Sequence, residues 1–422
     1  MVEKIIYTGK SLSRIDGKVV LSNEGLPGET IEAEPVKEKK NYIEAKILKV
    51  LTRSPNRTEP RCGHYKICSP YQYITYPQQI KIKEEQVREI FSKHIKEGRV
   101  NIILRPAANA WNYRNKMHLH IVWENNEPSL AYHSLDSQNE FTKIKECFLV
   151  SERINRLLDS LINITARHKM RFIKEVSVRE NSDRNQILLT LYGDSLKDAK
   201  RLFGNFDELK KAFPLRGIVY ADMITNDKYL AWGNDFIEEN IDGVLFNIGS
   251  ESFFQVNIPL LKRLVEDIKG SVSLRGDETI LDLYCGVGTF GLLLASKAAR
   301  VIGIESYEEN VFFARRNAQL NNINNFIIHK GECEKYIDEV TKTDIGFMII
   351  DPPRKGITKK ICDAILKKPI ASIAYISCDP ATLARDLNVL FLKYKLKLLY
   401  IYDFFPQTTH VEIMAFLERR TT

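Results

Sequence analysis

The sequence predicts an α/β protein of three domains, the last of which is a doubly wound parallel sheet. Its 422 residues are near three times the roughly 150 of one typical domain. From about residue 246 onward, apolar strand-like runs alternate with helix-like segments, the order that gives a parallel sheet with helices on both faces. Shorter β-rich and mixed segments come first. They predict a small β-barrel and then an α+β central domain.

The composition favours a packed, soluble chain. With 44% hydrophobic residues it can form several cores, which excludes a disordered protein. The net charge of +8 permits a polyanionic partner without requiring one, because a Lys/Glu-rich surface gives a similar value. No apolar run approaches the roughly 20 residues of a membrane span, and the first residues are unlike a signal peptide. We expect a cytoplasmic protein with no membrane contact and no obligatory protein partner; the oligomeric state stays open.

The first predicted domain covers residues 1–58. Short β-branched and aromatic runs are separated by glycines every 8–12 residues or so, which is the spacing of a small barrel. The segment has 11 Lys and Arg against 8 Asp and Glu, and Lys37, Lys39 and Lys40 share one turn. This turn is either a solvated surface or part of a barrel that binds nucleic acid.

The central domain is predicted to cover residues 59–245. Helices are expected from about Ile82 to Glu97, over Glu152–His168 with Ser151 as N-cap, and over Ser195–Lys211. The run Trp111–Lys116 combines aromatic and basic residues. Its side chains either pack in the protein or contact RNA, and the sequence favours neither alternative.

The third domain, residues 246–422, alternates four strands with four helices and ends in two strands that predict a hairpin. The strands are expected at Glu278–Leu283, Val301–Ile304, Gly346–Ile350 and Ile373–Ser377, the helices at Phe290–Lys297, Tyr307–Leu320, Thr358–Leu366 and Ala381–Phe391, and the hairpin strands at Leu396–Tyr402 and His410–Leu417.

A glycine-rich turn follows the first of these strands. Gly286, Gly288 and Gly291 fit G-x-G-x-x-G, and Glu305 ends the next strand, where an acidic side chain accepts hydrogen bonds from ribose hydroxyls. This Rossmann-like pattern predicts a nucleotide-like ligand and does not by itself separate a dinucleotide from S-adenosylmethionine. Asp282 and Tyr284 favour a ligand that is cationic at one end, because a carboxylate suits an ammonium group better than a pyrophosphate.

Two further motifs follow the next strands of the sheet. Asp351-Pro352-Pro353 ends one strand beside the expected ligand crevice, in a loop stiffened by two prolines. Cys378 ends another, just before Asp379 as N-cap and Pro380 as first helical residue. We expect the helix dipole and the basic pair Arg354-Lys355 to favour its thiolate; the alternative is a cysteine that packs as a small hydrophobe.

The last strand contains His410-Val411-Glu412. Strand alternation places His410 and Glu412 on one side and Val411 on the other. Glu412 is therefore either a general base or a salt-bridged surface carboxylate.

Together these residues resemble the RNA uracil-C5 methyltransferase family over nearly the whole chain. The segment from Gly25 to Glu29 is similar to a TRAM domain, an RNA-binding barrel, and Ser252–Asn257 and the four motifs above follow in family order. The resemblance implies a class I S-adenosylmethionine-dependent methyltransferase domain in which Cys378 is the nucleophile and Glu412 the base. It implies that the cofactor site contains Gln255, Tyr284, Glu305 and Asp351.

The family often holds an iron–sulfur cluster on four cysteines, and this chain departs from that pattern. Cys62, Cys68 and Cys147 match three positions, whereas the remaining position is Tyr71. The three thiols would hold an incomplete cluster, take a fourth ligand of another type, or pair as a disulfide.

The resemblance is greatest to the archaeal branch that methylates the T-loop uridine of tRNA, position 54. A ribosomal RNA uridine is the alternative substrate, because the two branches share the catalytic motifs. From another class, a dinucleotide-dependent oxidoreductase explains the glycine turn but gives Asp351 and Cys378 no role. An RNA-binding protein without activity explains the barrel alone.

Overall fold

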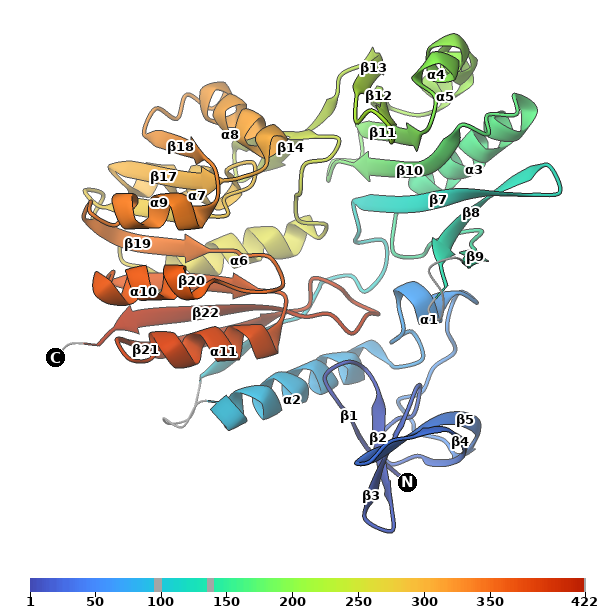
Figure 1. Cartoon of the computed structure of the whole chain (residues 1–422), viewed down its shortest axis with the longest axis horizontal. Coiled ribbons are helices and arrows are strands. Elements are labelled where there is room, and N and C mark those ends of the chain that lie inside the picture. The colour runs from blue at the N-terminus through green and yellow to red at the C-terminus, as the bar shows by residue number, and fades with distance from the viewer. Residues whose placement is uncertain (95–100, 135–139, 421–422) are drawn as a thin grey trace.

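The computed structural model describes residues 1–94, 101–134 and 140–420 (Figure 1). It contains an N-terminal five-stranded sheet, a seven-stranded central sheet and an eight-stranded C-terminal sheet, with a two-stranded hairpin between the last two. The predicted α/β fold with a small N-terminal β domain is confirmed. The exact domain limits 1–58, 59–245 and 246–422 stay a prediction, and two segments described below cross them.

The N-terminal barrel has the strand order β1-β2-β3-β5-β4, with only β3 and β5 parallel. Its strands are β1 (Val2–Ile5), β2 (Ser11–Ile15), β3 (Lys18–Ser22), β4 (Thr30–Glu38) and β5 (Tyr42–Thr52). Glu29 anchors the loop before β4: its fully buried carboxylate accepts from the Leu26 backbone N–H and pairs with Arg57 at 2.7 Å. A buried charge with such partners fixes the loop geometry.

The central sheet has the strand order β13-β12-β11-β10-β7-β8-β9, and helices cover one of its faces. Its strands are β7 (Lys116–Glu124), β8 (Glu127–His133), β9 (Phe141–Lys143), β10 (Ile173–Glu180), β11 (Ile187–Gly193), β12 (Leu215–Asp222) and β13 (Lys228–Gly233). The helices of this region are α1 (Tyr65–Cys68), α3 (Glu152–Arg167), α4 (Leu196–Leu202) and α5 (Asp207–Ala212), and a 3₁₀ turn, η1 (Phe203–Phe206), joins the last two.

The N-cap predicted for α3 is confirmed, because Ser151 Oγ accepts from the Ile154 N–H at 3.2 Å. The single helix predicted over Ser195–Lys211 is wrong: it is divided into α4, η1 and α5. Gly204 and Asn205 lie at the break, and both residue types have low helix propensity.

The C-terminal sheet has the order β18-β17-β16-β19-β20-β22-β21-β6. Its strands are β16 (Thr279–Leu283), β17 (Arg300–Glu305), β18 (Phe326–Lys330), β19 (Ile345–Ile350), β20 (Ser372–Ser377), β21 (Tyr394–Tyr402), β22 (Glu412–Arg419) and β6 (Ile102–Arg105). The first five are parallel, and β21 and β22 form the predicted antiparallel hairpin.

Helices cover both faces of this sheet (Figure 1), and buried clusters on its two sides form the core. They are α6 (Ile258–Ser271), α7 (Thr289–Leu294) with the 3₁₀ turn η2 (Ala295–Lys297), α8 (Glu308–Leu320), α9 (Cys333–Val340), α10 (Lys359–Lys367) and α11 (Pro380–Leu390). Three elements, α6, β18 and α9, were not predicted. The hairpin β14 (Phe236–Ile241) and β15 (Val244–Gly249) leads into this domain.

Two segments from the predicted central region belong to the C-terminal sheet instead. Strand β6 pairs in parallel with β21, and α2 (Tyr76–His94) packs against α11. Helix α2 begins six residues before the predicted Ile82, and the predicted residues 95–97 lie outside the described part of the chain. Among the described residues, no helix is long and apolar enough to cross a membrane.

A buried ion pair joins α2 to the loop between β21 and β22. Lys83 Nζ lies 2.5 Å from Asp403 Oδ1, and both side chains are almost fully buried. Gln79 and Gln407 add a reciprocal pair of hydrogen bonds at 2.8 and 2.9 Å. Helix α2 thereby fixes the loop that contributes Phe405, Thr408 and His410 to the site described below.

Replacing Lys83 with alanine should lower the free energy of unfolding by about 3–5 kcal/mol, because it leaves the buried Asp403 carboxylate without its counter-charge. Urea unfolding followed by circular dichroism measures the loss. The double variant Lys83→Met, Asp403→Leu should recover most of it. Unchanged stability in Lys83→Ala would contradict a contribution of the pair.

Candidate active site

A cavity of about 990 Å³ opens at the carboxyl edge of the C-terminal sheet. All six residues expected there line it: Gln255, Tyr284, Glu305, Asp351, Cys378 and Glu412. Four of them directly follow or end a strand, Glu412 begins one, and strand register explains why these five meet. Leu283 is paired with both Ile304 and Ile350, so the residues that follow, Tyr284, Glu305 and Asp351, lie at one edge.

The antiparallel pairing of β20 with β22 brings the other two together. Ser377 pairs with Ile413, so Cys378, which follows Ser377, and Glu412, which precedes Ile413, lie side by side at the sheet edge. Val411 and Ile413 point to the opposite side and belong to the apolar core. Strand β22 begins at Glu412, two residues later than predicted, but both His410 and Glu412 line the cavity, as the predicted alternation implies.

The glycine turn after β16 approaches the cavity closely. Gly288 is the N-cap of α7 with φ +85°, a conformation that other residues rarely adopt. A Cβ on Gly291 would lie 2.8 Å from the Phe326 ring, so α7 can pack against the sheet only with glycine there. Glu305 accepts from the N–H of Gly286 at 3.0 Å and from that of Tyr307 at 2.7 Å. These two hydrogen bonds fix the Glu305 carboxylate beside the glycine turn.

Asp282 has a different position from the one expected. Its side chain is fully buried and does not line the cavity; Oδ2 accepts from the Gly291 N–H at 2.8 Å. Burial raises the pKa of Asp282 to about 8. In the structure it holds the glycine turn through Oδ2, while its buried Oδ1 has no hydrogen-bond partner.

The cavity is rich in carboxylates. Burial raises the pKa of Asp351 to about 7. Burial, followed by the charge of Asp351, raises the pKa of Glu412 well above its usual range, and Arg354 acts in the opposite direction. Five acidic side chains line the cavity against three Lys and Arg, namely Glu305, Glu332, Glu334, Asp351 and Glu412 against Arg114, Arg354 and Lys355. A cationic group bound here would relieve the repulsion between the acids.

Cys378 is half-buried directly before α11. Asp379 is the N-cap of this helix, accepting from the Thr382 N–H at 2.7 Å, and Pro380 is its first residue, as predicted. The surroundings of Cys378 oppose the thiolate that the helix N-terminus and the basic pair were expected to favour. Burial raises the pKa of Cys378 to about 11, and Glu412 and Asp351 reinforce that shift more than Arg354 opposes it.

Alkylation of Cys378 by iodoacetamide should therefore be slow near neutral pH and accelerate up to about pH 11. Glu412→Gln removes a negative charge beside the thiol, so it should lower the pKa of Cys378 and raise its rate at a given pH. Mass spectrometry of the modified peptides measures both rates. Cys62 is the internal control, and an equal change at Cys62 would contradict a local effect.

The N-terminal barrel reaches this site. The Tyr7 hydroxyl, from the turn after β1, donates to Asp379 Oδ2 at 3.0 Å, next to the cysteine. The segment Trp111–Lys116 also contributes to the site. Arg114 lines the cavity, Asn115 donates a hydrogen bond to the Gln255 carbonyl, and Tyr113 donates one to the Pro406 carbonyl. Phe253, 64% exposed, lines the cavity as well. Arg114 and Phe253 belong to the segments Trp111–Lys116 and Ser252–Asn257, which the sequence analysis named, but neither residue was predicted individually as part of the site.

The residues present do not fit an iron–sulfur cluster. Among residues 1–94, 101–134 and 140–420, no group of three His, Cys, Asp or Glu side chains is arranged to hold a metal ion. Cys62, Cys68 and Cys147 are free thiols, and burial raises the pKa of each, that of Cys68 to about 11. Tyr71, at the remaining position, is a core residue whose hydroxyl accepts from Gln86 at 3.1 Å.

The same arrangement of sheets occurs in a solved structure. The Pyrococcus abyssi tRNA (uracil-54, C5)-methyltransferase, in complex with S-adenosyl-L-homocysteine, superposes with a TM-score of 0.77 at 24% identity and covers 99% of both chains. This likeness shows the fold. The fold and the cavity define an α/β protein with a nucleotide-type site at the switch point of its sheet.

Sequence relatives identify the class more closely. A Bacillus cereus protein described as an uncharacterized RNA methyltransferase is 30% identical over 99% of this chain and 95% of its own length. One from Clostridium tetani with the same description is 30% identical over 100% and 97%. The family model for tRNA (uracil-5-)-methyltransferases matches residues 75–420. The chain belongs to this family, which excludes the dinucleotide-dependent oxidoreductase.

Proposed function

We propose that this protein transfers a methyl group from S-adenosylmethionine to C5 of a uridine in RNA, and that the uridine is the T-loop residue 54 of tRNA. The observation that carries the proposal is the meeting of Cys378, Glu412 and Asp351 in one cavity beside a glycine turn. A uracil-C5 methyltransferase needs these groups together: a sulfur nucleophile, a base and a site for a cationic donor.

The cavity fits the methyl donor on the chemistry of its side chains. Glu305, at the end of β17, is placed to accept from ribose hydroxyls, and Tyr284 and Gln255 line the same space. Asp351 and the excess of carboxylates suit a ligand with sulfonium and ammonium charges. When bound, S-adenosylmethionine supplies the methyl group that uracil C5 receives.

The chain's own residues explain how C5 becomes reactive. The Cys378 thiolate forms a bond to C6 of the ring, which pushes the electron pair of the C5–C6 double bond toward C5 and O4. After C5 has gained its methyl group, Glu412 accepts the C5 proton. The C5–C6 double bond then forms again as the bond to Cys378 breaks and the thiolate leaves.

The protonation states fit this sequence of events. With a pKa near 11, Cys378 is mostly a thiol until a positive charge nearby offsets Glu412 and Asp351. A cationic donor bound at Asp351 supplies that charge, so the nucleophile is activated only when the donor is present. The raised pKa of Glu412 makes it a stronger base than an exposed glutamate.

The target base must leave its stack to enter the cavity, because C6 has to reach a half-buried cysteine at the sheet edge. The barrel adds a second RNA-binding element, with Lys37, Lys39 and Lys40 exposed on its surface. The Tyr7 hydroxyl of this barrel donates to Asp379, the neighbour of Cys378, which supports binding of one RNA by both parts. The tRNA named for the structurally similar Pyrococcus protein supports the choice of tRNA over ribosomal RNA.

The test is tritium release from C5-tritiated uridine in two transcripts, a tRNA and a ribosomal RNA fragment, with S-adenosylmethionine present. We expect release from the tRNA and none from the fragment. A tRNA with uridine 54 changed to cytidine is the position control. Release from the ribosomal fragment alone would overturn the substrate, and no release from either RNA would overturn the proposed reaction.

A further inference from the structure

The central sheet has one face that its helices leave open. On β7, Met117, Leu119 and Ile121 pack against the helices, so His118 and His120 point to the other face. The methyltransferase domain covers only part of that face: Arg179 donates to the Ser252 carbonyl, and Leu188 and Val219 share a core with Phe236. The rest of this face, which includes His118 and His120, is covered neither by the helices nor by that contact.

Planar rings occupy the uncovered part. His118 stacks on Tyr192 with ring centroids 5.1 Å apart, and the His120 ring lies 4.2 Å from that of His133. Phe141 stacks on His133 at 4.8 Å. The rings come from four strands, β7, β8, β9 and β11, and they remain accessible: the His118 side chain is 43% exposed and Phe141 is 41% exposed.

Strand register arranges part of these residues in one row across the sheet. Ala131 pairs with His120, His120 with Glu175, and Glu175 with Tyr192. Glu175 lies between the histidines and contacts His118 at 2.6 Å and His120 at 3.4 Å. We name the rings of His118, His120, His133, Phe141 and Tyr192 the ring row. Glu175 fixes the orientation of two of its members.

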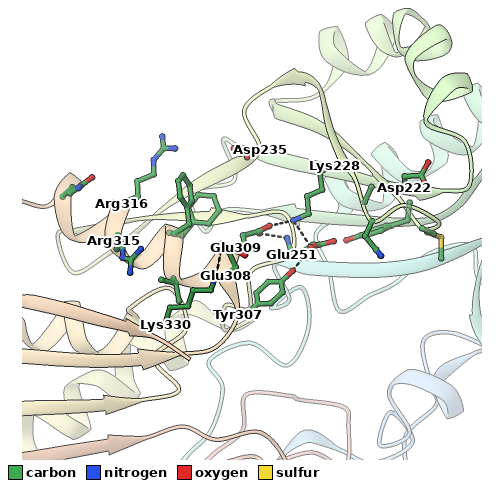
Figure 2. Close-up of a pocket in the computed structure, with 18 residues that line it drawn as sticks. Asp222, Lys228, Asp235, Glu251, Tyr307, Glu308, Glu309, Arg315, Arg316 and Lys330 are labelled. Atoms are coloured by element: carbon green, nitrogen blue, oxygen red, sulfur yellow. Dashed lines mark hydrogen bonds and ion pairs between the residues drawn. The ribbon is translucent and has the colours of Figure 1, made fainter. Parts of the chain in front are cut away.

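The ring row ends in a second cavity, of about 1230 Å³, between the central sheet and α8 (Figure 2). Tyr192 and Lys228 line it from the sheet; Phe312, Arg315 and Arg316 line it from α8. Phe312, Arg315, Arg316 and Gln319 are spaced so that they share one face of the helix. Phe312 is 55% exposed, and Arg315 makes no ion pair with any described residue.

Most acids of this cavity already have partners. Lys228 lies between Glu251 and Glu309, as Figure 2 shows, and Lys330 pairs with Glu308 at 2.9 Å. Asp222 accepts from three backbone N–H groups, and Asp235 is exposed. The arginine side chains on α8 are thus the cations of the cavity available to a ligand. Arg316 also lies over the Phe236 ring at 4.2 Å.

The cavity adjoins the candidate active site. Glu305 and Ser306 line the active-site cavity, and the next residues of the same turn, Tyr307 to Glu309, line this one. At the end of β18, Lys330 lines the second cavity, and the next residue, Gly331, lines the active-site cavity. A strand of RNA whose target base occupies the first cavity therefore has a direct route into the second.

We propose that the ring row and the arginine face of α8 bind unpaired nucleotides of the RNA substrate next to the target uridine. Bases stack on the exposed histidine, tyrosine and phenylalanine rings, a contact that any base can make, and Arg315 and Arg316 bind the phosphates. This surface deepens the proposed function and rests on it, because it needs an RNA substrate at the first cavity. Rings gathered on an open antiparallel sheet are a known basis for binding single-stranded RNA.

The test compares the full-length parent with the double variant His118→Ala, His133→Ala and with Arg315→Ala. Binding of a fluorescent tRNA transcript should weaken about tenfold in the histidine variant, from the loss of stacking. The slope of log affinity against log salt should fall by about 0.7 in Arg315→Ala, from one lost phosphate contact. The KM for tRNA should rise in both variants, with kcat at saturating RNA unchanged.

Two matched controls separate this surface from general effects. Trp232→Ala removes an exposed ring on the opposite face of the same sheet, where Lys210 of α5 lies 5.7 Å above it. Arg156→Ala removes an exposed arginine of α3. Both should leave RNA affinity unchanged. Circular dichroism melting confirms that each variant is folded.

The outcomes distinguish this inference from the proposed function. If the parent methylates RNA but the His118, His133 and Arg315 variants bind it as the parent does, the ring row has no part in RNA binding and the inference is overturned. If the parent releases no tritium from any RNA, the proposed function fails first. Crosslinking of a 4-thiouridine-substituted transcript to peptides containing His118 or Tyr192 would support the surface directly; crosslinks confined to the first cavity would contradict it.

Discussion

Replacing Cys378 with alanine should reduce methyl transfer by at least about 10⁴-fold, because the variant has no group that can add to C6. The ring carbon C5 is otherwise too weak a nucleophile to take the methyl group. Binding of S-adenosylhomocysteine should be retained, since the glycine turn and Glu305 are intact, and removal of the nearby thiol leaves the carboxylates in place. Tritium release measures the rate, and calorimetry measures the binding.

The control for this variant is Cys62→Ala. Cys62 is also a half-buried free cysteine, but it does not line the cavity, and its sulfur accepts from Gln72 at 3.3 Å. It should keep nearly full activity. Turnover by Cys378→Ala at a rate near that of the parent would disprove the covalent mechanism.

Replacing Glu412 with glutamine should slow turnover by about 10²–10⁴-fold and trap a protein–RNA adduct. The amide keeps the shape of the side chain but cannot accept the C5 proton, so the bond to Cys378 forms and does not break. The adduct should resist denaturing electrophoresis, and its formation should require both S-adenosylmethionine and the target uridine. The same substitution should lower the pKa of Cys378, so bond formation itself is not impaired.

Glu418→Gln is the matched control. It lies in the same strand, near the other end, where its partners are the exposed Lys395 and Lys397. It should neither trap RNA nor slow release. If Glu412→Gln turns over slowly without any adduct, a different residue removes the proton.

The sequence predicted the doubly wound sheet and the convergence of the site because both follow from where strands end. Tyr284, Glu305 and Asp351 each come at a strand terminus, and carboxyl ends of neighbouring parallel strands share an edge. Cys378 and Glu412 needed one more fact, the antiparallel pairing of β20 with β22. The predicted hairpin supplied the direction of β22 but not its neighbour in the sheet.

The electrostatics of the site were less predictable. The thiolate expected at Cys378 depended on a helix N-terminus and two basic residues that are visible in the sequence. The opposing charges, Asp351 and Glu412, are 27 and 34 residues away along the chain, and burial outweighs both. Likewise, Asp282 is next to the glycine turn in sequence, but only the packed structure shows its carboxylate turned inward to Gly291. Burial and the direction of a side chain are properties of the tertiary fold.

The pairing of β6 with β21 has a consequence for how this chain is made. Tyr402 lies beside Arg105, 402 − 105 = 297 residues earlier in the sequence. On the ribosome, residues 102–105 emerge long before their partner strand exists, and the whole central sheet can fold in the meantime. Until β21 has been made, this short strand exposes unpaired backbone groups that other chains can bind. This pairing can therefore form only after β21 has been made, and a chain that stops before residue 394 cannot form it.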